Sequence, residues 1–213
     1  KQALPNFGVF DEQRYFTPGQ QTFTFELKLH KFAVLICEDV WQGYPAADAK
    51  AAGAEIALVL NASPYEIGKI AQRQQLLSTL AKRLQLGFAY VNQTLGQDEL
   101  VFDGSSLLVQ PNGDIAWQAP AFSRDIYRAE FTHDGHHLRI KHQLPPTPSQ
   151  SLEAEVYQAL VLATRDYIQQ NGFPGAVLGL SGGIDSALTL AIAVDAIGAD
   201  KVQALMLPFR YTS

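Results

Sequence analysis

Two glycines and two serines separate an apolar run from a helical pattern in the stretch LGLSGGIDSALTL (178–190). Gly182 and Gly183 let the backbone adopt positive φ and approach a ligand closely. The helix predicted after them offers free N–H groups and a partial positive charge, and Ser181 and Ser186 add hydroxyl donors. The pattern predicts an anion site built mostly from backbone. The alternative is a glycine-rich turn without a ligand.

Neither common phosphate motif fits this loop. A Walker A loop needs a lysine after its glycines, and Ile184 and Asp185 stand there instead. The spacing from Gly179 also fails the dinucleotide fingerprint. An acid inside a phosphate loop is understandable if it faces a Mg²⁺ ion that sits on the phosphates. Asp185 is therefore the candidate metal ligand.

Cys37 is the single cysteine and closes the apolar run FAVLIC (32–37). A lone cysteine in such a run is more often an inert core residue. Glu38, Asp39 and Trp41 follow it, however, at the predicted carboxyl end of a buried strand, where α/β sheets place their ligands. A thiol there can be an activated nucleophile if a base and a cation are near.

The elements that must position these residues alternate in type. Apolar runs and helical periodicity predict, in order, a strand at 31–39, a helix at 45–54, a strand at 55–63, a helix at 66–86 and a strand at 88–94. Gly87 is the expected C-cap of the second helix. Asn112-Gly113 predicts a hairpin within 105–120, and 125–131 is a third extended run. An α/β layer with antiparallel strands attached indicates a mixed sheet or sandwich.

A second unit is predicted after the proline-rich stretch 132–150, which has the composition of a linker. Ser151 can cap a helix that runs to about Gln170. A strand, the loop, a helix at 185–197 and another strand follow as one βαβ unit. The predicted division is thus a first domain at 1–131, a linker at 132–150 and the start of a second domain at 151–213.

Four of the five histidines lie in this predicted linker: His133, His136, His137 and His142. Their spacing matches no standard ligand pattern and no cysteine assists them. We therefore assign no metal site to them.

Composition narrows the classes of partner. The 213 residues are 47% apolar with a formal net charge of −5, which argues against a nucleic-acid partner because such proteins usually carry a basic face. A single cysteine forms no disulfide framework, which fits a cytoplasmic protein. No apolar run reaches the length of a membrane span, and no signal peptide is visible. The chain begins at Lys1 rather than at a methionine, and we expect it to be a fragment of a longer protein.

The six residues SGGIDS (181–186) resemble the SGGxDS loop of the ATP-pyrophosphatase, or PP-loop, family. Those enzymes cleave ATP between the α and β phosphates, require Mg²⁺ and adenylylate an oxygen of their substrate. The resemblance implies the start of a doubly wound α/β domain of the adenine nucleotide α hydrolase-like kind. It also implies a loop that binds ATP and pyrophosphate through Gly179, Leu180, Ser181, Gly182, Gly183, Ile184, Asp185 and Ser186, with Asp185 on the metal.

Two other segments resemble the nitrilase, or carbon–nitrogen hydrolase, family: LICEDVW (35–41) and KQALPNFGVFDEQRYF (1–16). The resemblance implies a nitrilase-like α-β-β-α sandwich. It also implies that Cys37 attacks a carboxamide carbon, forms a thioester and releases ammonia, while Lys1 stabilises the developing negative charge. The family's general base, a glutamate, would precede Lys1. The matching positions for holding the substrate glutamine are Phe7, Glu38, Ser63 and Lys69.

The combination of these two motifs is similar to the family of glutamine-dependent NAD⁺ synthetases. The segments NASPYEIGK (61–69), GQDELVFDGSS (96–106) and LPFRYTS (207–213) are similar to stretches of that family as well. The resemblance implies that ammonia from glutamine converts adenylylated deamido-NAD⁺ to NAD⁺, with release of AMP and pyrophosphate, in a homo-oligomer. Two alternatives stay open: a stand-alone carbon–nitrogen hydrolase, and a catalytically incomplete piece that serves only oligomer contacts.

Overall fold

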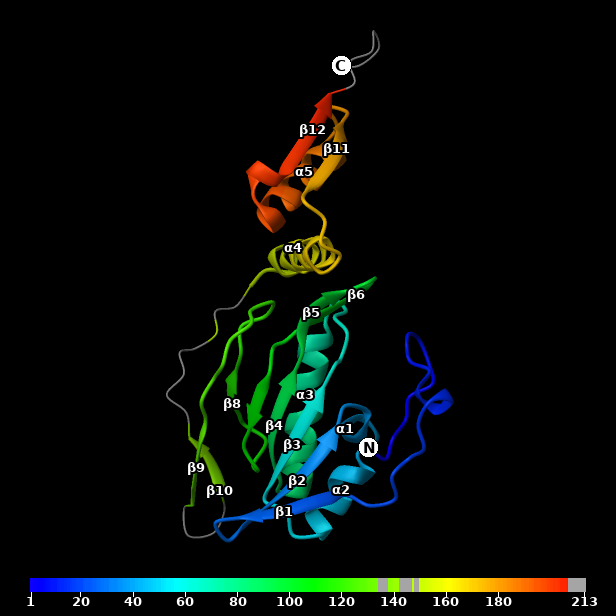
Figure 1. Ribbon diagram of the computed structural model, residues 1–213. Coiled ribbons are helices and arrows are strands. Elements are labelled where there is room, and N and C mark those ends of the chain that lie inside the picture. Colours follow the sequence, from blue (N-terminus) through cyan, green and yellow to red (C-terminus); the bar gives the residue numbers. More distant parts are fainter. Residues whose placement is uncertain (134–137, 142–146, 148–149, 207–213) are drawn as a thin grey trace.

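The computed structural model describes residues 1–133, 138–141, 147 and 150–206. Figure 1 shows two units stacked end to end, a larger one built on a broad sheet and a smaller one that contains α4, β11, α5 and β12. The end of β12, the last described element, lies at the far tip of the smaller unit, and the N-terminus lies beside the sheet of the larger one.

A six-stranded sheet forms the centre of the larger unit, in the order β1-β2-β3-β4-β7-β8. Its strands are β1 (Phe23–Leu27), β2 (His30–Ile36), β3 (Ile56–Asn61), β4 (Gly87–Asn92), β7 (Leu107–Val109) and β8 (Ile115–Gln118). The three inner strands β2, β3 and β4 are parallel, and the outer ones are added antiparallel. The predicted mixed sheet is confirmed.

Three helices cover one face of this sheet (Figure 1). They are α1 (Glu38–Gln42), α2 (Tyr44–Ala51) and α3 (Lys69–Leu84), and a short 3₁₀ helix, η1 (Glu12–Arg14), lies in the N-terminal segment. Leu77, Leu80 and Ala81 of α3 meet Val59 and Phe88 of the strands in one buried cluster. This cluster is the larger of the two buried clusters and forms the main core. Burial of its apolar side chains is the dominant favourable term in folding.

The other face of the sheet carries the hairpin of β9 (Glu130–His133) and β10 (Leu138–Lys141). Leu138 and Ile140 pack there on Phe32 and Ile56. The hairpin overlaps the beginning of the stretch 132–150 that composition predicts to be a linker. Its pairing depends on an apolar sheet face that no local pattern reveals, and the domain boundaries themselves stay a prediction.

Several predicted boundaries are wrong by a few residues. The C-cap of α3 is Gln85, which adopts φ +50°, whereas Gly87 already belongs to β4. A side chain at position 87 would collide with Ile56, so a close approach between strands requires this glycine. Glu38 and Asp39 belong to α1 rather than to the end of the strand. In the extended run 125–131, only the last two residues belong to a strand.

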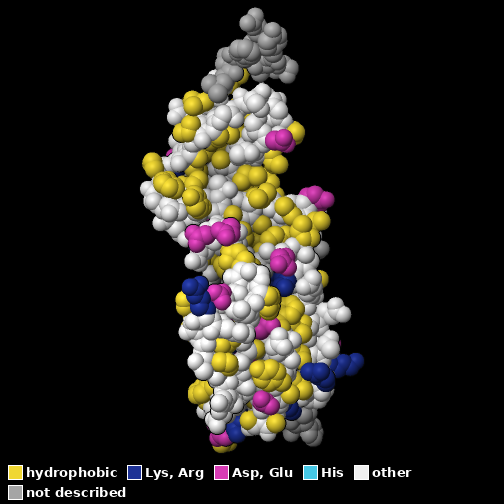
Figure 2. All heavy atoms as spheres, turned by 90° about the vertical axis from the view of Figure 1, so that its right-hand side faces the viewer, with side chains coloured by type: hydrophobic (Ala, Val, Ile, Leu, Met, Phe, Trp, Pro, Cys, Tyr) yellow, Lys and Arg dark blue, Asp and Glu magenta, His cyan; other side chains and the backbone are white. Residues whose placement is uncertain are grey.

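The smaller unit contains α4 (Leu152–Gln170), β11 (Ala176–Leu180), α5 (Ile184–Ile197), η2 (Ala199–Lys201) and β12 (Val202–Met206). The two strands are parallel, which confirms the predicted βαβ unit. Ser151 caps α4 as expected, because its hydroxyl accepts from the Ala154 N–H at 3.3 Å. Apolar side chains are frequent on the surface of this unit (Figure 2), among them Val177, Ile184 and Met206.

The hairpin of β5 (Thr94–Gln97) and β6 (Leu100–Asp103) joins the two units, because α4 packs against it. The buried carboxylate of Asp166 on α4 accepts from the Gly96 N–H at 2.7 Å and pairs with Arg124. Gln170 donates to the Gly96 carbonyl at 2.9 Å. None of the helices in the described part of the chain is long and apolar enough to cross a membrane.

We expect Gly96→Val to loosen the contact between α4 and β5. A Cβ at position 96 would lie 3.0 Å from the Cα of Ala163 and 3.1 Å from the Cβ of Asp166. Overpacking of this kind costs about 1–3 kcal/mol of unfolding free energy, measurable by chemical denaturation. Gly172→Asn is the control, because position 172 has open space and asparagine tolerates its φ of +68°. An equal midpoint for Gly96→Val and the control would contradict the tight contact.

Candidate functional site

Five of the six residues predicted to act on an amide line one cleft of about 380 Å³, whereas the sixth, Lys1, is not among its lining residues. The structure brings together Phe7, Cys37, Glu38, Ser63 and Lys69 on its walls, with Trp41, Tyr65 and Glu66 beside them. The cleft lies at the carboxyl ends of parallel strands, where α/β sheets bind ligands. The cysteine is half-buried rather than sealed in the core.

Cys37 occupies a sharp turn between β2 and α1. Its φ of +47° is strained for a residue with a side chain. The turn is held from both sides, because the Cys37 N–H donates to the Leu60 carbonyl at 3.0 Å and its own carbonyl accepts from the Val40 N–H at 3.2 Å. These two hydrogen bonds maintain the strained conformation, which places the sulfur at the end of the strand.

Burial raises the pKa of the Cys37 thiol above its usual value. The positive charge of Lys1 acts against burial and lowers this pKa, as does the Ala62 N–H, whereas the carboxylates of Glu38 and Glu12 raise it further. The thiol is therefore protonated at neutral pH. It needs a base to become the nucleophile.

Lys1 is not a solvated surface lysine. Its ammonium lies between both carboxylate oxygens of Glu12, with a distance of 2.5 Å to Oε1. Its side chain is only 14% exposed. Glu12 is a site residue that the sequence did not indicate, since nothing in an aperiodic segment shows that the chain turns back to place η1 beside Lys1.

Asp39 anchors the segment that carries Lys1. Its Oδ1 accepts from the N–H groups of Gln2 and Ala3, both at 2.8 Å, and its Oδ2 accepts from the Ile36 N–H at 2.9 Å. The carboxylate is buried and makes three charge-assisted hydrogen bonds, which are about twice as strong as neutral ones. It therefore joins the residues after Lys1 to the residue before Cys37.

Ser63 is buried and held by its backbone. The side-chain amide of Asn92 accepts from the Ser63 N–H at 2.9 Å and donates to its carbonyl at 3.4 Å. Glu38 accepts from the side-chain amide of Gln42 at 2.8 Å. Phe7 is exposed on the rim, where it contacts Phe10 edge to face.

Lys69 is the first residue of α3, and its ammonium lies 4.6 Å from the ring centroid of Trp41. One turn further on, the buried Arg73 fixes this end of the helix. It pairs with Asp103 at 2.5 Å and donates to the Gly104 carbonyl at 3.2 Å. The ion pair connects α3 to the end of β6, and it holds the start of the helix in place beside the cleft.

Residues 181–183 lie exposed between β11 and α5, and residues 184–186 form the first turn of α5. Gly182 adopts φ +86°, as predicted for both glycines, whereas Gly183 is extended with φ −84°. The hydroxyls of Ser181 and Ser186 lie 3.1 Å apart, and Ser186 also donates to the Gly183 carbonyl at 2.9 Å. These bonds shape the turn, while the first N–H groups of the 14-residue helix lack intrahelical partners. The geometry suits an anion at the helix start.

Asp185 is the one carboxylate of this loop. Within the described ranges, no three His, Cys, Asp or Glu residues gather as a metal cluster. A metal at Asp185 would take its other ligands from phosphate oxygens and water, which suits Mg²⁺. His133 lies in β9 and stacks near His30, with ring centroids 5.3 Å apart. The other three histidines of the predicted linker lie outside the described residues.

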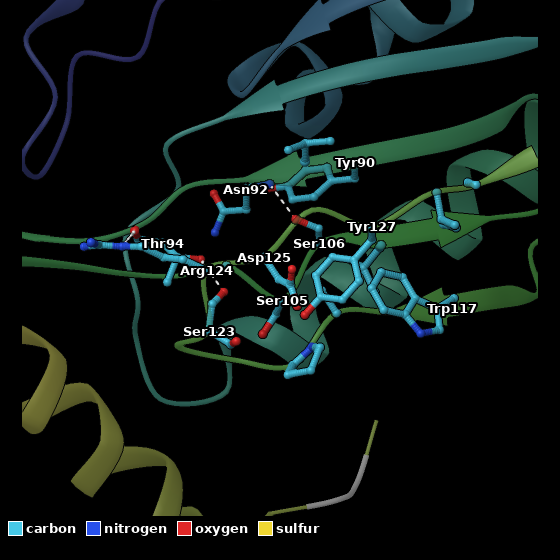
Figure 3. Close-up of a pocket in the computed structure, with 17 residues that line it drawn as sticks. Tyr90, Asn92, Thr94, Ser105, Ser106, Trp117, Ser123, Arg124, Asp125 and Tyr127 are labelled. Atoms are coloured by element: carbon cyan, nitrogen blue, oxygen red, sulfur yellow. Dashed lines mark hydrogen bonds between the residues drawn. The ribbon is translucent and has the colours of Figure 1, made fainter. Parts of the chain in front are cut away.

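A second cavity of about 330 Å³ lies between β4, β7, β8 and the chain that follows them (Figure 3). Some of its polar groups are bonded within the protein, whereas the hydroxyls of Tyr90 and Ser105 are buried without a hydrogen-bond partner among the described residues. Ser106 accepts from the Asn92 N–H at 3.0 Å, and Arg124 donates to the Thr94 carbonyl at 3.0 Å while pairing with Asp166. Cys37 and Lys1 are not among its lining residues, and it is not the site of the predicted amide chemistry.

The arrangement defines an α/β protein with a cysteine cleft at the ends of parallel strands, followed by a βαβ unit with a glycine loop. The chain belongs to the carbon–nitrogen hydrolase family, whose model matches residues 3–139. The NAD synthase model matches residues 156–213. These matches bear out the predicted fold class, a nitrilase-like unit followed by the start of an NAD synthase unit.

Similar proteins cover both units. The chain is 54% identical over its whole length to a glutamine-dependent NAD(+) synthetase of Acinetobacter baylyi, and 40% identical to one of Rhodobacter capsulatus. It superposes with a TM-score of 0.94 and 55% identity on the structure of glutamine-dependent NAD⁺ synthetase from Acinetobacter baumannii in complex with ADP. The chain spans 39%, 38% and 40% of the lengths of these proteins, respectively.

We expect Lys1→Met in the full-length protein to raise the pKa of Cys37 further, because the substitution removes the charge that opposes burial. The rate of alkylation by iodoacetamide, followed on the Cys37 peptide by mass spectrometry, should rise at a higher pH than in the wild type. Lys82→Met, on the exposed face of α3, is the control and should leave the profile in place. A Lys1→Met profile that is unchanged or shifted to lower pH would contradict the proximity of the two side chains.

Proposed function

We propose that the full-length protein is a glutamine-dependent NAD⁺ synthetase, an ATP-dependent carbon–nitrogen ligase. The observation that carries the proposal is the presence of a cysteine cleft and an SGGIDS loop on one chain. The cleft would release ammonia from glutamine. The loop would serve the activation of deamido-NAD⁺ by ATP.

The chemistry proposed for the cleft begins at Cys37. A base, expected to be a glutamate that precedes Lys1, takes the thiol proton, and the sulfur attacks the carboxamide carbon of glutamine. Lys1 stabilises the negative charge on the oxygen. The C–N bond then breaks, the nitrogen takes the proton and leaves as ammonia, and a thioester remains. Water attacks the thioester, the C–S bond breaks, and glutamate leaves with the thiol restored.

The walls of the cleft supply charges of both signs for a zwitterionic substrate. Lys69 would bind the α-carboxylate and Glu38 the α-amino group, while Ser63 and Phe7 complete the pocket around the chain of the amino acid. A substrate amide with a carboxylate and an amino group at its far end fits such a pair.

The loop would bind ATP and retain the pyrophosphate after deamido-NAD⁺ is adenylylated. Its contributors are the backbone from Gly179 to Asp185 and the hydroxyls of Ser181 and Ser186. A Mg²⁺ ion on Asp185 would neutralise phosphate charge. Ammonia would then displace AMP to give NAD⁺. A cytoplasmic location and a homo-oligomer are part of the same proposal.

We expect Cys37→Ala in the full-length protein to lower glutamine-dependent NAD⁺ formation roughly a thousandfold or more and to spare formation from free ammonia. Only the first reaction needs the sulfur. Both rates are measured with ATP and deamido-NAD⁺ present. Equal loss of both would contradict two separate sites. Glutamine hydrolysis without any release of pyrophosphate from ATP would instead favour the stand-alone hydrolase.

The complementary change is Gly182→Val in the loop. A β-branched residue strains at φ +86°, so we expect NAD⁺ formation from glutamine and from ammonia to fall together, by about 10–100-fold. Hydrolysis of glutamine in the cleft, measured as glutamate release, is the internal control and should persist. Unimpaired synthesis from ammonia would remove the loop from the proposed mechanism.

A further inference from the structure

Trp41 lines the cleft together with Cys37 and Lys69, the nucleophile and the cation of the proposed chemistry. It stands on α1, four residues after Cys37, and its indole packs against the main core cluster. The same ring lines the cleft and faces the ammonium of Lys69 at 4.6 Å. The side chain is therefore held by the core on one side and contacts a cation on the other.

The position of Lys69 is electrostatically unfavourable for its helix. It is the first residue of α3, where the helix dipole disfavours a positive charge. Its ion pair with Glu66 is long, 3.9 Å between Nζ and Oε2, and Glu66 is 72% exposed, so this pair contributes little. Yet the Lys69 side chain is only 23% exposed. Helix stability does not explain a half-buried cation at this point.

The indole of Trp41 accounts for this placement. A cation over an indole face is attracted by the ring quadrupole, and tryptophan is the strongest of the aromatic partners. The ring face attracts the ammonium without accepting a conventional hydrogen bond from it. The N–H donors of Lys69 therefore remain available for a ligand in the cleft. Because α1 also carries the nucleophile at its start, the ring fixes the cation relative to the sulfur.

We propose that Trp41 is a positioning residue that sets the affinity of the cleft for the substrate's carboxylate by holding the Lys69 ammonium over its ring. The inference rests on the proposed glutaminase function and adds to it a residue that acts through another. It assigns selectivity for amides with a carboxylate at the far end to the Trp41–Lys69 pair, since an uncharged amide gains nothing from a fixed ammonium.

The test is a double-mutant cycle in the full-length enzyme on the kinetics of glutamine hydrolysis. We expect Trp41→Leu to raise the KM for glutamine about 10-fold, in line with a partly desolvated cation–π contact, and to leave kcat within about twofold. Trp41→Phe keeps an aromatic face and should recover most of the affinity. In a Lys69→Met background, Trp41→Leu should have no further effect on KM, because contacting residues that act as a unit are not additive.

Trp117→Phe is the matched control, since Trp117 is the other tryptophan of the chain and lines the second cavity instead. It should leave the KM for glutamine unchanged. Thermal unfolding of each variant separates a folding defect from a binding defect. The same cycle on the dissociation constant of glutamine for the Cys37→Ala enzyme, measured by calorimetry, gives a readout that does not need turnover.

Two outcomes would overturn the inference while the wild type remains a glutaminase. One is an additive loss in the double variant, which would make Trp41 a packing residue independent of Lys69. The other is a fall in kcat with an unchanged KM for Trp41→Leu. Absence of glutamine hydrolysis in the wild type would overturn the proposed function instead, so the two failures are distinguishable.

Discussion

The carboxylate of Asp39 is the interaction on which the cleft depends. It accepts two N–H groups from the segment after Lys1 and one from the end of β2. The N-terminal segment belongs to no strand, so single bonds place it. The two bonds to Asp39 act together with the bond from the Gly19 N–H to the Lys1 carbonyl, 2.8 Å long, and with the Lys1–Glu12 ion pair. Removing the acceptor would leave the buried Ala3 N–H unpaired, which costs about 1–3 kcal/mol, and would also remove the bonds of the two part-buried N–H groups. The same carboxylate sits two residues after the nucleophile, and so it ties the cation and the sulfur to one turn.

A second constraint links the cleft to the unit beyond it. Tyr65 lines the cleft, and burial together with the nearby Glu155 carboxylate raises the pKa of its hydroxyl. Glu155 lies in the first turn of α4, the helix that packs on β5 through Asp166 and Gly96. On its other side, Tyr157 of α4 donates to Asp195 of α5 at 2.6 Å. One helix therefore contacts both the hairpin next to the amide cleft and the helix that begins at the glycine loop.

Local patterns in the sequence predict most of the elements, because strands, helices and caps depend on residues close in the chain. The strand before Cys37, the hairpin at Asn112-Gly113 and the Ser151 cap are examples. Long-range pairs are not visible in this way. The bond between Gly96 and Asp166 joins residues 70 positions apart, and the β9–β10 hairpin forms on a sheet face assembled from distant strands. The sequence around Gly87 predicts a helix cap, whereas the structure places Gly87 in β4 beside Ile56 of the neighbouring strand.

In the candidate site, too, residues within local motifs can be predicted from the sequence, and long-range partners cannot. Residues within motifs, such as Cys37, Ser63 and Lys69, line the same cleft, and their roles stay a prediction. The partners of Lys1, Ser63 and Lys69 are Glu12, Asn92 and Trp41, respectively. No motif marks them as partners, because each acts across a turn or between strands.

The proposed chemistry depends most on a covalent bond between Cys37 and the acyl group of glutamine. To test this covalent bond, the full-length protein is quenched with acid while it turns over glutamine. It is then digested, and the Cys37 peptide is analysed by mass spectrometry. We expect the Cys37 peptide to gain the mass of glutamine less ammonia. Active glutamine hydrolysis with Cys37 unmodified, and the acyl group absent or on another residue, would contradict it.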